Sequence, residues 1–96
     1  MRADYDSEAD ALLIELRRVD RIDDQEQVDD DYCVVSIVGG SVVSIGLLYP
    51  ARYLNLLEVA AERYGLDDIA LVAAAKAALA APDRLIELEV GAPIAA

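Results

Sequence analysis

The first half of the chain alternates apolar and polar residues with the period of two that is typical of β-strands. In segment 11–16, Leu12, Ile14 and Leu16 fall on one face. Residues 2–5 suit a shorter strand, and residues 6–10 are rich in side chains that hydrogen-bond local backbone amides in turns. The pattern therefore predicts two strands joined by a tight acidic corner.

Gly39-Gly40 lies between two further alternating segments, 32–38 and 41–48, and predicts a β-hairpin. A two-residue Gly-Gly loop would mix apolar and polar side chains on both faces. A three-residue loop over 38–40 would gather the apolar ones, and a one-residue slip inverts every side chain, so we expect the longer loop. The apolar face would hold Cys33, Val35, Ile37, Val43, Ile45 and Leu47. The other face would hold Val34, Ser36, Val42, Ser44, Gly46 and Leu48, a set too apolar to be left fully exposed to water.

The segment 17–31 between these strand pairs is polar and predicts a solvated connection, with room for a brief paired piece around Ile22 or Val28. Asp29, Asp30 and Asp31 close this segment. Three acids in a row could crowd a cation, but such a run before a strand more often forms a solvated turn, and we expect the turn.

The period changes to a helical one after Pro50, which suits a helix start. Gly65 is placed as the C-terminal cap of this first helix. Asp67 can cap a second, alanine-rich helix that ends before Pro82. Residues 85–90 alternate once more and predict a closing strand.

Together these elements predict one α+β domain over residues 1–96. A four-stranded antiparallel meander occupies 1–48, and residues 49–96 add two helices packed on one face and a C-terminal strand that returns to the sheet edge. The apolar residues on the other face predict either wrapping by the second helix or self-association, most simply as a two-fold homodimer.

The formal net charge of −11 is concentrated near the start of the chain, where residues 1–31 hold twelve acids against four arginines. Such a surface repels phosphate backbones, which disfavours direct binding to nucleic acid or to an anionic membrane. Basic proteins or cations are the natural complement. The simplest explanation is that the charge keeps a chain with 56% hydrophobic residues soluble.

Cys33 is the only cysteine, so an intrachain disulfide is excluded and a reducing cytoplasm fits. The first residues are charged from Arg2 onward and lack a secretory apolar core. The longest hydrophobic stretch, 69–75, is far shorter than the roughly 20 residues needed to span a bilayer. We expect a soluble, cytoplasmic protein.

The acidic corner has the ligand spacing of a calcium-binding EF-hand loop. The five acids in that register are Asp4, Asp6, Glu8, Asp10 and Glu15. However, Ala9 stands where the loop requires glycine, and the flanks read as strands instead of helices. A plain corner is therefore favoured, with a weaker divalent-cation site at Asp4, Asp6, Glu8 and Asp10 as the alternative.

The sequence offers no catalytic constellation. Cys33 has no histidine anywhere in the chain to act as its base, so we expect it to be a small core residue. Tyr53 and Tyr64 fall at helical spacing with leucines and are interpreted as core or boundary residues. We expect no enzyme activity, no catalytic residues and no cofactor.

Two stretches, "YDSEADALLIEL" at 5–16 and "VVSIVGGSVVSIGLL" at 34–48, resemble the small bacterial family catalogued as domain of unknown function 2283. The first motif matches at Tyr5, Asp6, Glu8, Ala9, Asp10, Ala11, Leu12 and Ile14. The second is looser, since Ser44 and Gly46 replace the usual Gly and Glu. The resemblance covers the first half of the chain and implies a four-stranded antiparallel sheet. The family has no established activity and no agreed catalytic residues, so it assigns none to this chain. Some family members are suspected antitoxins of small ribonuclease-like toxins.

These observations lead to one functional expectation. The protein is predicted to be a small, acidic, non-enzymatic interaction module that binds itself or, like an antitoxin, neutralises a basic protein partner. Divalent-cation binding through the acidic corner is the alternative.

Overall fold

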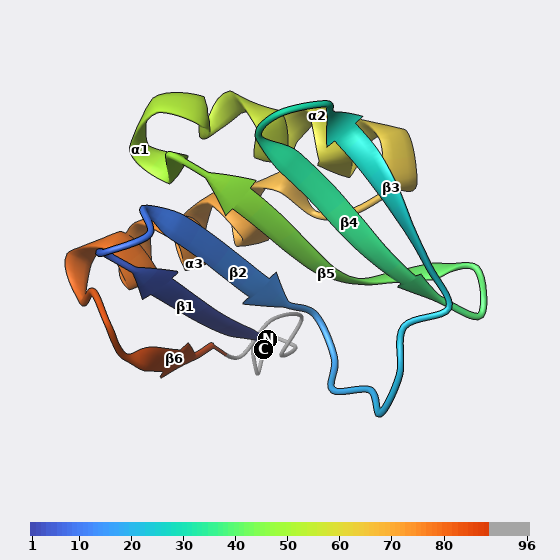
Figure 1. Ribbon diagram of the computed structural model, residues 1–96, viewed down its shortest axis with the longest axis horizontal. Helices are drawn as coiled ribbons and strands as arrows, with labels where there is room; N and C mark the ends of the chain where they lie inside the picture. The colour runs from blue at the N-terminus through green and yellow to red at the C-terminus, as the bar shows by residue number, and fades with distance from the viewer. Residues whose placement is uncertain (89–96) are drawn as a thin grey trace, which may run out of the picture.

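Six strands form one antiparallel sheet in the computed structural model, which describes residues 1–88 (Figure 1). The strands are β1 (Arg2–Asp6), β2 (Ala11–Glu15), β3 (Asp24–Asp29), β4 (Cys33–Val38), β5 (Ser41–Leu48) and β6 (Leu85–Glu87). The helices are α1 (Pro50–Tyr53), α2 (Asn55–Tyr64) and α3 (Asp68–Ala80). The α+β class with an antiparallel sheet, predicted from the alternation of apolar residues, is confirmed.

Residues 1–48 supply five strands where a four-stranded meander was predicted, and the order β3-β4-β5-β2-β1-β6 departs from a meander at the step after β2. β2 pairs with β5 and not with the strand that follows it in the chain. The connector 16–23 crosses to the far edge, where β3 begins (Figure 1). β3 has the sequence DQEQVD and is mostly exposed, which suits an edge position, whereas the apolar β5 lies between two strands.

The hairpin between β4 and β5 turns on two residues, so the predicted three-residue loop is wrong. Val38 pairs with Ser41, and Gly39 and Gly40 have φ of 59° and 80°. Positive φ at both central residues defines the type I′ turn, whose twist matches that of the flanking strands.

A β-bulge at Val43 explains how the predicted apolar face forms despite the shorter loop. Ile37 pairs with Val42, but Ser36 pairs with Ser44, so one residue of β5 is left unpaired. The extra residue shifts the register and sets Val35 opposite Ile45 and Cys33 opposite Leu47. Five of the six side chains predicted for this face are buried: Cys33, Val35, Val43, Ile45 and Leu47. Ile37 is only partly buried.

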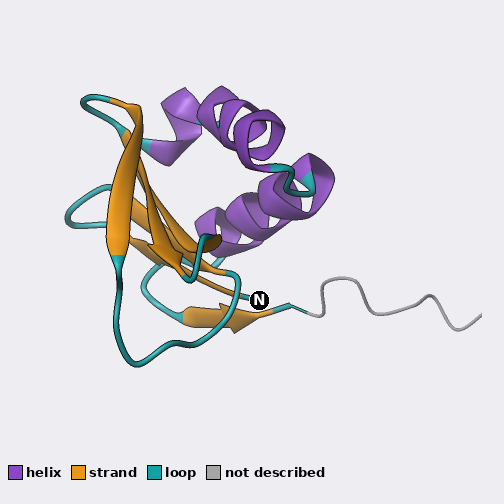
Figure 2. Cartoon of the chain, turned by 90° about the vertical axis from the view of Figure 1, so that its right-hand side faces the viewer, coloured by secondary structure: helices purple, strands orange, loops and turns teal. Residues whose placement is uncertain are grey.

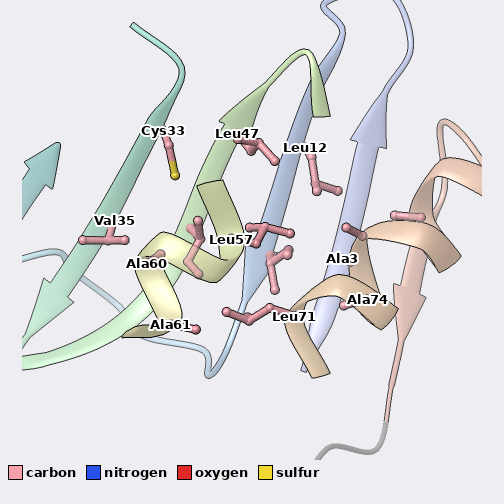
Figure 3. Close-up of a cluster of buried hydrophobic side chains, with 14 residues drawn as sticks. Ala3, Leu12, Cys33, Val35, Leu47, Leu57, Ala60, Ala61, Leu71 and Ala74 are labelled. Carbon is pink, nitrogen blue, oxygen red and sulfur yellow. The ribbon is translucent and has the colours of Figure 1, made fainter. Parts of the chain in front are cut away.

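Both longer helices cover the same face of the sheet (Figure 2). Leu57 of α2 and Leu71 of α3 are buried between helices and strands (Figure 3). The helix surfaces around them are mostly alanine, which lets the backbones approach closely. The buried alanines are Ala60, Ala61, Ala74, Ala75 and Ala78. The prediction that helices pack on one face is therefore confirmed, and wrapping of the other face by the second helix is not observed.

The helix limits follow the local signals. The first predicted helix is divided at Leu54 into α1 and α2. Gly65 ends α2 with φ 69°, and the Asp67 side chain accepts a hydrogen bond from the Ala70 amide at 3.1 Å to cap α3. In the chain as far as residue 88, no helix is both long enough and apolar enough to cross a membrane.

The closing strand returns to the sheet edge as predicted. β6 pairs antiparallel with β1, with Ile86 opposite Ala3. The Leu88 amide donates to the Met1 carbonyl at 2.8 Å and continues the pairing. Glu89 and Val90, which the prediction also included, lie outside the described residues.

Candidate functional site

The acidic stretch that joins β1 to β2 is a tight corner, as predicted. The Asp6 carboxylate accepts hydrogen bonds from the amides of Glu8 and Ala9 at 3.0 and 3.1 Å. Asp10 is in the left-handed conformation with φ 53°, which aspartate tolerates better than most residues. Its carboxylate accepts a hydrogen bond from the Tyr5 hydroxyl at 2.7 Å. Two of the four candidate cation ligands thus hold the corner itself.

The structure does not bring these carboxylates together. Asp4 and Asp6 pair with Leu13 and Ala11, and they lie on the sheet face that no helix covers. Tyr5 alternates to the helical side and draws Asp10 toward it. Within residues 1–88, no group of three or more His, Cys, Asp or Glu side chains is arranged to hold a metal ion.

The other sequence candidates have structural roles. Asp29 accepts hydrogen bonds from the amides of Asp31 and Tyr32, both at 3.0 Å, so the acidic run forms the β3–β4 turn. Cys33 is buried beside it, and burial, with a smaller contribution from Asp29, raises the pKa of its thiol to about 11. The thiol is therefore protonated at neutral pH and unsuited to nucleophilic attack. Tyr64 is a boundary residue whose hydroxyl donates to Glu26 at 2.6 Å.

The uncovered face of the sheet is the strongest candidate for a functional site. Side chains of paired residues point to the same face, so Val34, Gly46 and Leu13 form one row across β4, β5 and β2. The row continues through Asp4 to Leu85 of β6. Leu13 is 43% exposed and Leu85 49% exposed, so apolar surface remains open to water here. We call this surface the open sheet face, made of Ala11, Leu13, Val34, Gly46, Leu48 and Leu85.

A hollow of about 330 Å³ lies on the open sheet face, and we call it the sheet-face hollow. Val34, Gly46 and Leu48 contribute to its lining from β4 and β5. The absence of a side chain at Gly46 keeps this position open, because an added Cβ would meet Val34 Cγ1 at 3.3 Å. Asp30 and Asp31 of the β3–β4 turn contribute carboxylates to the lining.

Carboxylates also flank the open sheet face on β1, β2 and β6. Asp6 pairs with Ala11, and Glu15 and Glu87 both pair with Arg2. The Arg2 guanidinium forms an ion pair with Glu15 at 3.0 Å, and Arg17 and Arg18 line the same hollow as Glu15 and Glu87, so this end of the face carries both signs of charge. The face therefore combines apolar residues, with Asp4 among them, and a negative margin at the end that holds Asp6, Asp30 and Asp31.

A group of tyrosines beside this face is a feature that sequence reasoning missed. The Tyr32 ring stacks on Tyr53, with centroids 4.2 Å apart, and Tyr49 meets Tyr32 edge-on at 5.9 Å. The Arg52 guanidinium lies 5.6 Å from the centre of the Tyr53 ring. With Asp10, these residues line a second hollow of about 490 Å³, which we call the tyrosine pocket.

Hydrogen bonding couples these rings to their surroundings. The pKa of Tyr32 is raised mainly by its hydrogen bond with Tyr53, and Asp31 adds a smaller electrostatic effect. The pKa of Tyr5 is raised mainly because its hydroxyl donates to Asp10. The Tyr5 and Tyr32 phenols are therefore neutral at physiological pH. The sequence contains a signal for this group of tyrosines, because Tyr32 directly precedes β4 and Tyr49 directly follows β5. Whether the two rings meet depends on the register of the β4–β5 hairpin.

Comparisons with protein-family models, with curated proteins and with solved structures found no match for this chain. The resemblance of residues 5–48 to domain of unknown function 2283 therefore stays a prediction.

Proposed function

We propose that this protein is a non-enzymatic interaction module that binds a basic protein partner on its open sheet face. The observation that supports this most is the row of Val34, Gly46 and Leu13, which lies uncovered and has carboxylates around it. An apolar patch with a polar margin is the usual anatomy of a protein-binding surface.

The apolar centre supplies a driving force for docking. Complete burial of a leucine side chain contributes about 1.5–3 kcal/mol relative to full exposure. Leu13, Leu48 and Leu85 are 39–49% exposed, so each would contribute about 1 kcal/mol when a partner covers it. Asp4 lies between Leu13 of β2 and Leu85 of β6 in the row, so a partner that covers both leucines must supply a positive group to pair with this carboxylate.

The negative margin favours a basic partner over a neutral one. The net charge of −11 attracts positively charged proteins over several ångströms and accelerates their association. An antitoxin-like role, in which this protein covers the basic active site of its partner, is consistent with this arrangement. Its binding should weaken as salt is added, because exposed charges are screened within about 8 Å at physiological ionic strength.

Capture experiments with matched variants test the proposal. Leu13→Ser removes apolar surface from the open sheet face, and Ile69→Ser removes it from α3, where Ile69 is 78% exposed on the helical side. We expect a basic protein to be captured by the wild type and by Ile69→Ser, and to be lost with Leu13→Ser. Equal capture by all three chains, or capture that is insensitive to salt, would contradict the proposal.

Self-association through the same face stays a prediction, and salt separates it from binding to a basic partner. A dimer would bring two chains of charge −11 together, so added salt should strengthen it. Light scattering over a dilution series at low and high salt measures this directly. A monomer at all concentrations and both salt levels would rule out the dimer.

A further inference from the structure

We infer that the tyrosine pocket is a site for a cationic side chain, an arginine or a lysine, carried by the partner. The inference rests on the proposed function and deepens it, because it gives the open sheet face a residue-specific contact beside its apolar centre.

The position of the pocket links it to the docking face. Tyr32 lines both the sheet-face hollow and the tyrosine pocket, so the two hollows adjoin at this ring. A partner that places an apolar side chain in the sheet-face hollow can place a neighbouring side chain of its own in the tyrosine pocket. Successive side chains of an extended peptide point to opposite sides, and those two residues apart point the same way.

The chemistry of the pocket matches a cation. Aromatic faces carry negative electrostatic potential and attract guanidinium and ammonium groups. Asp10 adds a carboxylate to the pocket lining, and Asp31 lies close enough to Tyr32 to raise its pKa. Arg52 is the positive group among the lining residues, and it already lies near the Tyr53 ring. Arg52 is therefore an internal example of the proposed contact and a competitor for it.

The backbone holds Tyr49 in an unusual conformation at this site. Its φ of 49° and ψ of 56° are left-handed, which bulky side chains rarely adopt. The Tyr49 amide donates to the Asp10 carbonyl at 2.8 Å, and Pro50 follows it. Tyr49 is nevertheless 47% exposed as a residue, so this conformation is not explained by its burial. It keeps Tyr49 next to Asp10 on the wall of the pocket.

Titration with a short peptide tests the pocket without the partner. The probe is an N-acetylated, amidated tetra-arginine peptide, and its control is the tetra-citrulline peptide, which has the same shape without the charge. In NMR spectra of the full chain, we expect saturable shifts of the Tyr32, Tyr49 and Tyr53 ring signals with tetra-arginine. Equal shifts with tetra-citrulline would overturn the inference.

Two charge variants separate the pocket from the acidic surface as a whole. Asp10→Asn removes the pocket carboxylate, and asparagine tolerates the left-handed backbone and still accepts a hydrogen bond from Tyr5. Asp20→Asn removes one charge from the exposed connector as a matched control. We expect Asp10→Asn to reduce the ring shifts at least threefold and Asp20→Asn to leave them within error. Arg52→Gln should enlarge them, because it removes the competing cation. Equal losses in both Asn variants would contradict a specific site.

The two proposals fail in different ways. Leu13→Ser should abolish partner capture and leave the peptide-induced ring shifts unchanged, since Leu13 lies outside the tyrosine pocket. Capture that does not depend on Leu13, together with saturable ring shifts, would refute the docking face alone. Unmoved tyrosine signals, together with Leu13-dependent capture, would refute the cation site alone.

Discussion

Asp83 and Ser7, which lie 76 positions apart in the chain, join the first hairpin to the loop after α3. The Asp83 carboxylate accepts hydrogen bonds from both the amide and the hydroxyl of Ser7. Asp83 is itself in the left-handed conformation, with φ 63°, and its amide donates to the Tyr5 carbonyl. These hydrogen bonds hold the acidic corner against the segment that leads into β6.

This contact predicts a dependence of stability on pH. The hydrogen bonds from Ser7 lower the pKa of Asp83 in the folded chain. When folding lowers the pKa of a carboxyl group, its charged form stabilises the folded chain. This stabilisation is fully present at pH values above the pKa of the unfolded chain and is lost as the pH falls through the pKa of the folded chain. Asp83→Asn tolerates the same backbone but cannot be charged. We expect it to melt below the wild type at pH 7, with the gap closing as the pH falls below 3.8, the ordinary pKa value for aspartate. A constant gap in thermal unfolding between these pH values would contradict the linkage.

The β4–β5 hairpin shows how far alternation can predict a fold. The pattern identified which side chains share the buried face, but it could not reveal how the register is achieved. A bulge at Val43 and a longer loop both place one extra residue between the same apolar positions, so the pattern alone does not distinguish them. Two consecutive glycines are typical of the two-residue turn, which the apolar pattern led us to reject and which the chain uses.

Substitutions at Gly39 test the type I′ turn. A Cβ built on Gly39 meets nothing within 4 Å, so only its positive φ penalises a side chain. Gly39→Ala should lower the free energy of unfolding by about 1 kcal/mol. Gly39→Asn should cost less, because asparagine is favoured at the first position of this turn. Urea unfolding of both variants provides the measurement. Equal costs for Ala and Asn would argue against a left-handed requirement at this position.

β3 and the tyrosine pocket mark the limits of prediction from this sequence. β3 has almost no apolar alternation, so the sequence predicted only a brief paired piece around Ile22 or Val28, and the structure extends a strand over Asp24–Asp29. Its pairing with β4 uses backbone hydrogen bonds, which leave little trace in the side-chain pattern. The tyrosine pocket joins residues 10, 32, 49, 52 and 53, which only the completed sheet and α1 bring together. Local features such as the caps at Gly65 and Asp67 depend on neighbouring residues and were predicted correctly.

The buried position of Cys33 predicts low reactivity. Since burial raises the pKa of its thiol to about 11, the thiolate is a small minority at pH 8. We expect the native chain to react with a disulfide reagent such as dithionitrobenzoate at least 100-fold more slowly than the chain unfolded in urea. Rapid labelling of the native chain, at the rate of a free thiol, would show that Cys33 is accessible.

The geometry of the acidic corner predicts weak or absent calcium binding. Asp6 and Asp10 already accept hydrogen bonds within the corner, and Glu15 forms an ion pair with Arg2. We expect calorimetry with calcium and with magnesium to show no saturable heat up to millimolar ion. A saturable signal that disappears in Asp6→Asn, which can keep the same turn, would restore the divalent-cation alternative.

Filling the sheet-face hollow should weaken binding of the partner without destabilising the fold. In Gly46→Ala, the new methyl group would meet Val34 Cγ1 at 3.3 Å, so the valine must shift by a few tenths of an ångström. Alanine also suits a strand better than glycine by about 0.5–1 kcal/mol, which offsets this crowding. We expect the free energy of unfolding in urea to stay within about 1 kcal/mol of the wild type, while capture of the basic partner falls. Capture at the wild-type level by a folded Gly46→Ala chain would mean that the partner does not enter the hollow.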